Sequence, residues 1–131
     1  MDKNIQRMYT LINAWAMEVA LDLIHIDLDI IKNSNELRRY VKELTEMFNL
    51  SPYGEANLYN FDDKGYVVTQ IMESAFLSGH FVEDKACAFI NMSVCKPFDM
   101  EKVTTFSTEF FKPKGVTVRV FLREQELTKD E

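Results

Sequence analysis

The feature that most constrains the fold is the alternation of side-chain type in the segment "WAMEVALDLIHI", residues 15–26. One side of this segment carries Val19, Leu21 and Leu23, and the other carries Glu18, Ala20 and Asp22. A period of two residues indicates a β-strand that turns one face to a hydrophobic core. The stretch "VTVRVFL", residues 116–122, alternates in the same way and predicts a final strand.

Two other segments carry apolar residues at helical spacing. The first follows Asp27 or Asp29, either of which could cap a helix, and runs to about Phe48. The second follows Asp99, which can cap it, and Gly115 can end it.

Between these two helices lie four segments with strand character, "ANLYNF", "YVVTQIME", "AFLSGHF" and "ACAFINMSVC". The turn "DDKG" joins the first two as a hairpin, and the third is a strand or a turn. A doubly wound parallel sheet would need more crossover helices than two. The sequence therefore predicts an α+β two-layer sandwich, with a mainly antiparallel sheet and two helices packed on one face.

Length and composition fit one domain over residues 1–131, with a charged tail from about residue 124. The net charge of −6 argues against nucleic-acid binding, and no apolar run is long enough to span a membrane. The N-terminus lacks the pattern of a signal peptide, which predicts a cytoplasmic protein with free thiols.

Cys87 and Cys95 lie eight residues apart in one strand region, too far apart to bond each other. No His or Cys spacing typical of a metal site occurs.

Two side chains could carry chemistry: His80 in "ESAFLSGHFVED" and Cys95 in "INMSVCKPFD". A single histidine is more often a surface or satisfied core imidazole, and a single cysteine is more often a small buried apolar residue than a reactive thiol. His25, the other histidine, falls at the end of the first strand and receives no role.

At these same residues the sequence resembles the prokaryotic S-adenosylmethionine decarboxylase proenzymes, over roughly Trp15 to Arg123. The resemblance rests on "ESAFLSGHF", "CKPFD", "VALDL", "PYGE" and "VTTFSTEFF", which occur in the family's order. The family pattern places a histidine five residues after a serine and a cysteine some fifteen residues later. Position 75, His80 and Cys95 have this spacing.

The resemblance implies a lyase of polyamine (spermidine) synthesis that makes its own cofactor. In the family, the chain cleaves itself before the motif serine and leaves a pyruvoyl group, which serves as the electron sink for decarboxylation. It further implies that His80 assists processing and that Cys95 donates a proton during catalysis. Phe61 aligns with an aromatic residue that stacks on the adenine of the substrate in the family. Packing in the core of the protein is an equally compatible role for Phe61. Prokaryotic members form homodimers, so the resemblance implies a homodimer here.

The sequence departs from the family at the decisive position, because Ala75 stands where the self-cleaving serine is expected. Alanine has no hydroxyl, so no pyruvoyl group can form at the predicted cleavage site Ser74–Ala75. Ser74 is a displaced alternative nucleophile, but alternation would turn it to the other face of a strand. Eight residues before Ala75, where relatives often have a second serine, the chain has Val67.

Three explanations account for Ala75. In the first, Ala75 is an engineered serine-to-alanine substitution. In the second, the protein is a natural non-catalytic homologue that binds ligands or regulates an active partner subunit. In the third, the protein is a homologue that acts on another substrate. Ornithine and arginine are such substrates, and the acidic net charge would suit a cationic amino acid.

Overall fold

The computed structural model describes residues 2–62 and 64–124 of the chain. Four helices and six strands follow one another: α1 (Asp2–Leu11), β1 (Ala16–Ile24), α2 (Leu28–Ile31), α3 (Ser34–Met47), β2 (Asn57–Asn60), β3 (Gly65–Met72), β4 (Ala75–Val82), β5 (Cys87–Val94), α4 (Met100–Phe111) and β6 (Gly115–Arg123). The predicted charged tail lies, from residue 125 onward, outside the described residues.

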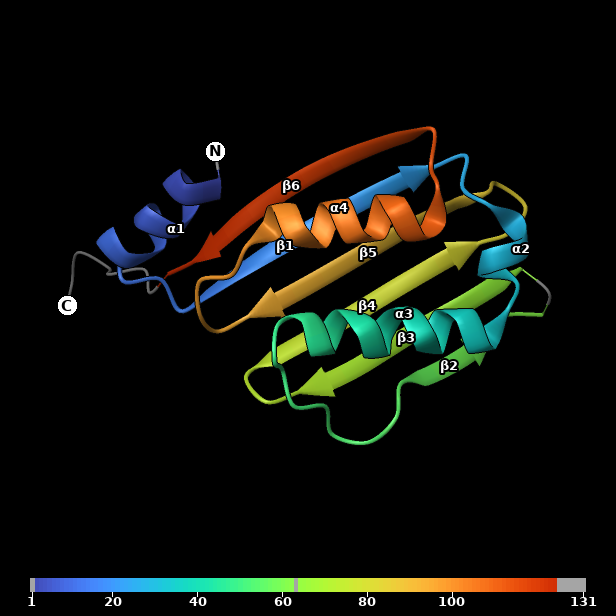
Figure 1. Ribbon diagram of the computed structural model, residues 1–131, viewed down its shortest axis with the longest axis horizontal. Helices are drawn as coiled ribbons and strands as arrows, with labels where there is room; N and C mark the ends of the chain where they lie inside the picture. Colours follow the sequence, from blue (N-terminus) through green and yellow to red (C-terminus); the bar gives the residue numbers. More distant parts are fainter. Residues whose placement is uncertain (1, 63, 125–131) are drawn as a thin grey trace, which may run out of the picture.

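The six strands form one sheet in the order β2-β3-β4-β5-β1-β6, and every neighbouring pair is antiparallel. Figure 1 shows α3 and α4 side by side in front of this sheet. The predicted α+β class and the mainly antiparallel sheet are therefore confirmed, and "AFLSGHF" is a strand. No helix among the described residues is long and apolar enough to cross a membrane.

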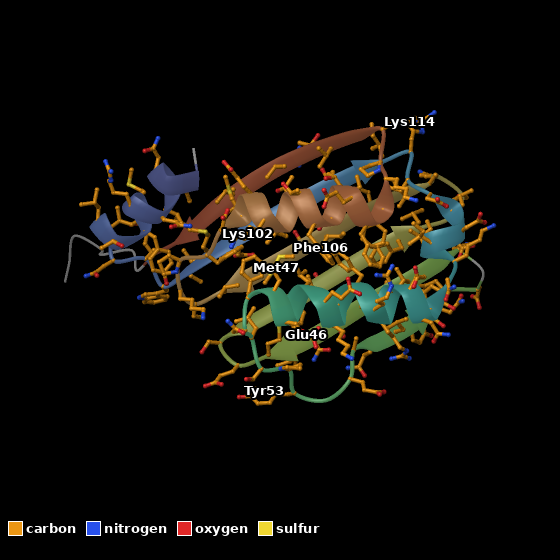
Figure 2. The ribbon with its side chains drawn as sticks, viewed as in Figure 1. Glu46, Met47, Tyr53, Lys102, Phe106 and Lys114 are labelled. Carbon is orange, nitrogen blue, oxygen red and sulfur yellow. The ribbon has the colours of Figure 1, made fainter. Side chains whose placement is uncertain are left out.

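The core lies between the sheet and these two helices. Alternation in β1 buries Met17, Val19, Leu21 and Leu23 on the helix side, as the sequence predicts. Tyr40 of α3 anchors the core, because its ring centroid lies 4.6 Å from that of Phe111 in α4. Figure 2 shows that Met47 of α3 and Phe106 of α4 also lie close together where the helices face each other, and both line one shallow groove there.

The single helix predicted between Asp27 and Phe48 is wrong in one respect, because the structure divides it into α2 and α3. Asp27 caps α2 by accepting a hydrogen bond from the Asp29 amide. Asn33 then caps α3, and its side chain accepts hydrogen bonds from the amides of Asn35 and Glu36. An asparagine side chain that binds backbone amides favours a helix start over a helix interior, and this explains the break.

Two further elements differ from the sequence prediction. The helix α1 was not predicted at all, although Ile5, Met8 and Tyr9 recur at helical spacing within it. Asp99 caps α4 as predicted, but the helix ends at Lys112 in a left-handed conformation (φ 53°) and not at Gly115. Gly115 instead begins β6, where an added Cβ would lie 2.9 Å from the Ile24 side chain.

The sheet face opposite α3 and α4, here called the open face, carries large apolar side chains without a covering layer of described helices. Its exposed members are Tyr59, Phe61, Ile71, Phe76, Phe89 and Phe121. Toward β6, this face also carries ion pairs from Arg119 to Asp22 and from Arg123 to Glu18. Exposed apolar patches of this kind are typical of interaction surfaces.

The buried hydrogen bond between the Tyr40 hydroxyl and Ser107 Oγ, 2.7 Å long, generates a stability prediction. Removal of either hydroxyl group leaves the other hydroxyl group buried without its hydrogen-bond partner. Tyr40→Phe and Ser107→Ala should therefore each lower the free energy of unfolding by about 1–2 kcal/mol. The double variant should lose less than the sum of the two. Urea unfolding of the four proteins measures this, and strictly additive losses would contradict it.

Candidate functional site

The predicted cleavage position lies at the tight turn between β3 and β4. Met72 pairs with Ala75, which leaves Glu73 and Ser74 as the two turn residues. Ser74 has a positive φ of 60°, a conformation that is uncommon for a residue other than glycine. The expectation that strand alternation orients Ser74 is therefore wrong, because Ser74 belongs to the turn. Ala75 is the first residue of β4, half-buried and packed against the core.

A backbone hydrogen bond holds the carbonyl group that precedes Ala75. The Cys95 amide donates to the Ser74 carbonyl oxygen at 2.9 Å, next to the pairing of Ala75 with Val94. A donor aimed at a carbonyl oxygen stabilises the negative charge that develops there during nucleophilic attack. The arrangement therefore suits attack on the peptide bond before residue 75, although Ala75 itself offers no nucleophile.

A second group of site residues lies toward the other end of β4, on the open face. His80 pairs directly with Val67 of β3 and with Phe89 of β5. The ring centroid of His80 lies 6.3 Å from that of Phe61 and 6.4 Å from that of Phe89, while Tyr59 stands edge-on to Phe61 at 4.9 Å. These five residues make a half-exposed aromatic surface around one imidazole, which suits a flat ligand.

The structure thus brings Phe61, Val67 and His80 together but separates them from Ala75 and Cys95. His80 follows Ala75 by five residues along one strand, a span of about 17 Å at the usual rise per residue. The odd spacing also turns Ala75 to the core while His80 lies on the open face. A single chain therefore holds two separate groups of candidate residues: Ser74, Ala75 and Cys95, named here the hairpin half-site, and the five residues of the surface around His80, named here the aromatic half-site.

The two cysteines differ in environment, and both are free, as predicted. Cys95 is exposed, whereas Cys87 is buried at the start of β5. Burial raises the pKa of the Cys87 thiol, since an ionised thiolate is poorly solvated there. Cys95 is thus the accessible thiol of the chain.

Tyr9 of α1 is a neighbour of the hairpin half-site that sequence analysis missed. The pKa of its phenol is raised, first by burial and then by the charge of Cys95, so the two groups lie within electrostatic reach of each other. No sequence signal could have linked Tyr9 to Cys95, because the helix itself was not predicted. Tyr59 and Phe89 were missed for a different reason: only the strand register brings them beside His80.

The remaining histidine, His25, occupies a turn after β1 with a positive φ of 56°. Within residues 2–62 and 64–124, no group of three or more His, Cys, Asp or Glu side chains could hold a metal ion. The candidate residues named above offer one imidazole, one thiol and the backbone amide of Cys95.

Comparison with known proteins shows the family and the fold of this chain. Residues 17–124 match the S-adenosylmethionine decarboxylase family, and the chain belongs to that family. The match starts after α1, so this helix precedes the part of the chain that the family shares. None of the curated proteins matches the chain.

Two solved structures show the same fold. The crystal structure of the adenosylmethionine decarboxylase from Aquifex aeolicus VF5 matches with a TM-score of 0.76 and 18% identity, covering 90% of this chain and 96% of that one. The Trypanosoma brucei AdoMetDC-delta26 monomer matches with a TM-score of 0.57 and 16% identity, covering 79% of this chain and 45% of that one. At such identities the likeness concerns the fold.

The difference between the thiols predicts two rates of alkylation. Iodoacetamide at pH 8 should label Cys95 at least about tenfold faster than Cys87, because only the thiolate reacts and burial limits Cys87. Peptide mass spectrometry at timed intervals follows both sites, and Cys87→Ser and Cys95→Ser variants assign them. The structure would be contradicted if Cys87 and Cys95 were labelled at equal rates in the native protein as well as in urea.

Proposed function

We propose that this chain is an S-adenosylmethionine decarboxylase-family protein of spermidine synthesis that remains an unprocessed chain because residue 75 is alanine. The observation that carries the proposal is the hairpin itself. The Ser74 carbonyl, which a hydroxyl at residue 75 would attack, accepts a hydrogen bond from the Cys95 amide, yet Ala75 ends at Cβ. Two free thiols suit a reducing compartment, which supports action in the cytoplasm.

The residues of the hairpin do not fit formation of the pyruvoyl group on which the family depends. That group arises from a serine, and residue 75 supplies no oxygen. Ser74 has a hydroxyl, but the peptide bond before Ser74 uses the Glu73 carbonyl and not the carbonyl held by Cys95. Val67, directly opposite His80, likewise offers no hydroxyl to support processing. The native chain is therefore expected to stay intact.

The aromatic half-site supports binding of the adenine part of S-adenosylmethionine. Phe61 presents a half-exposed ring on the open face, and Tyr59 and Phe89 border the same surface. Stacking of a purine on an aromatic face contributes roughly 1–3 kcal/mol in proteins that bind bases. This surface does not depend on residue 75, so ligand binding can persist in a chain that has no cofactor.

A homodimer joined through the open faces would bring the His80 surface of one protomer toward the hairpin end of the other, while the Ala75 side chain itself turns to the core. Each copy presents the same surface in a two-fold symmetric contact, and opposite ends of the two sheets meet when the axis crosses the strands. The exposed apolar residues Phe76 and Phe89 on the neighbouring strands β4 and β5, with charged residues toward β6, support such an interface.

Restoring the serine tests the proposal. Ala75→Ser should cleave between Ser74 and residue 75 and yield a second fragment that begins with a pyruvoyl group, as intact-mass spectrometry and denaturing gels would show. Adding Val67→Ser beside His80 should raise the rate of cleavage at least about tenfold if that hydroxyl takes part in proton transfer.

The matched controls are the native chain, which should remain at 15.3 kDa, and Ser74→Ala combined with Ala75→Ser, which should still cleave. The proposal fails if the native chain cleaves itself at Ser74, or if the chain with serines at both 67 and 75 never cleaves.

Association through the open face predicts a dimer that one charge can disrupt. Phe76, 43% exposed on the open face of the central strand β4, would be buried between two copies, so Phe76→Glu should weaken the dimer by at least about a hundredfold. Light scattering after gel filtration should give twice 15.3 kDa for the native chain and the monomer mass for the variant. Leu11→Glu, at a 72% exposed position on α1, is the matched control and should remain dimeric. A native monomer at micromolar concentration would exclude this assembly.

A further inference from the structure

A second concave site lies on the helix side of the molecule, away from both half-sites. It is a cavity of about 210 Å³ between α3 and the loop of residues 48–56. Its lining consists of Arg38, Val41, Lys42, Thr45, Pro52, Gly54, Glu55, Ala56 and Gln70. Figure 2 places Tyr53 on this loop, below α3 in that view. The volume suits a ligand of about ten or fewer non-hydrogen atoms, since drug-sized pockets are larger.

Two cations flank the cavity from one side. Arg38 and Lys42 are four residues apart on α3 and so lie on the same face of the helix. Arg38 Nη1 donates to the Ala56 carbonyl at 2.9 Å, which fixes its guanidinium at the cavity and leaves its other donors for a ligand. Among the described residues, neither Arg38 nor Lys42 forms an ion pair with a carboxylate. The neighbouring Arg39, by contrast, pairs with both Glu36 and Glu43.

The other walls combine hydrocarbon with a few polar groups. Val41, Pro52 and Ala56 supply hydrocarbon surface, and Glu55 contributes one carboxylate from an exposed position on the loop. Gln70, only 3% exposed, closes the cavity, and its amide donates to the carbonyl groups of Gly54 and Ile71. With two cations against one carboxylate and hydrocarbon beside them, the cavity suits a molecule that has one anionic group and a compact apolar body.

The loop that lines the cavity also holds the end of β3, next to the cleavage turn. The Tyr53 amide donates to the Ile71 carbonyl, and the Glu73 amide donates to the Ser51 carbonyl, each at 2.9 Å. Between them, Pro52 forms an isolated bridge with Met72. Glu73 immediately precedes Ser74, so the cavity and the turn share one short stretch of hydrogen-bonded backbone.

We propose that this cavity binds a small organic carboxylate, whose anionic group contacts Arg38 and Lys42 and whose apolar part contacts Val41, Pro52 and Ala56. Binding tightens the 48–56 loop against the end of β3 and so limits opening of the Glu73–Ser74 turn. The site uses no residue of either half-site. Its existence therefore does not depend on the proposed decarboxylase function.

The test titrates the native chain with three compounds of one shape: benzoate, benzyl alcohol and benzylamine. Amide chemical shifts should report saturable benzoate binding around α3 and residues 51–56, with a Kd on the order of millimolar for so small a ligand. The neutral and cationic analogues should bind at least about tenfold more weakly, because they lose the charge-assisted contacts. Hydrogen exchange at the amides of Tyr53 and Glu73 should slow when benzoate is bound.

Substitutions then assign the site. Arg38→Gln with Lys42→Gln should weaken benzoate binding at least about tenfold, while Arg39→Gln on the same helix should leave it unchanged. Lys42→Gln alone, which retains the hydrogen bond from Arg38 to Ala56, should weaken binding several-fold and guards against a folding defect in the double variant.

Three outcomes would overturn the proposal: benzylamine binds as tightly as benzoate, the double variant binds benzoate with unchanged affinity, or inorganic phosphate binds as tightly as benzoate. None of these outcomes bears on cleavage of the Ala75→Ser chain, so the two proposals fail separately.

Discussion

The register of β4 between β3 and β5 is the constraint on which the rest of the structure depends. One face of these strands is buried under α3 and α4. A shift of the strand pairing by one residue would therefore expose the side chains of Leu77 and Phe81 to solvent. The same register sets Ala75 opposite Met72 and brings the Cys95 amide onto the Ser74 carbonyl. The packing of the core thereby also determines which carbonyl group of the turn accepts the hydrogen bond from Cys95.

The hairpin and the aromatic surface are built from different residues. His80 lies beside aromatic rings, and Cys95 has an accessible thiol and a backbone hydrogen bond to the turn. Ala75 has no side-chain oxygen, and the turn determines which carbonyl group precedes it. The aromatic surface does not include residue 75.

Particular residues show how far the sequence could be followed. The alternation around Val19 gave the correct buried face of β1, and Asp99 gave the correct start of α4, because both signals are local. The cap at Asn33 was overlooked because it falls inside an otherwise continuous helical pattern. The spacing of position 75, His80 and Cys95 suggested one site, whereas β4 carries His80 away from position 75 and the pairing of β4 with β5 brings only Cys95 next to it.

The sequence alone determined the alternation that builds an antiparallel sheet, the two principal helices, the family resemblance and the absence of an oxygen at position 75. These are properties of residue identity and near-neighbour spacing. Only the tertiary structure decided that His80 and Ala75 belong to separate half-sites, that Phe89 lies beside His80, and that Tyr9 lies near Cys95. The reason is that strand register and the docking of α1 join residues distant in sequence, and burial of the whole core, not any local pattern, selects them.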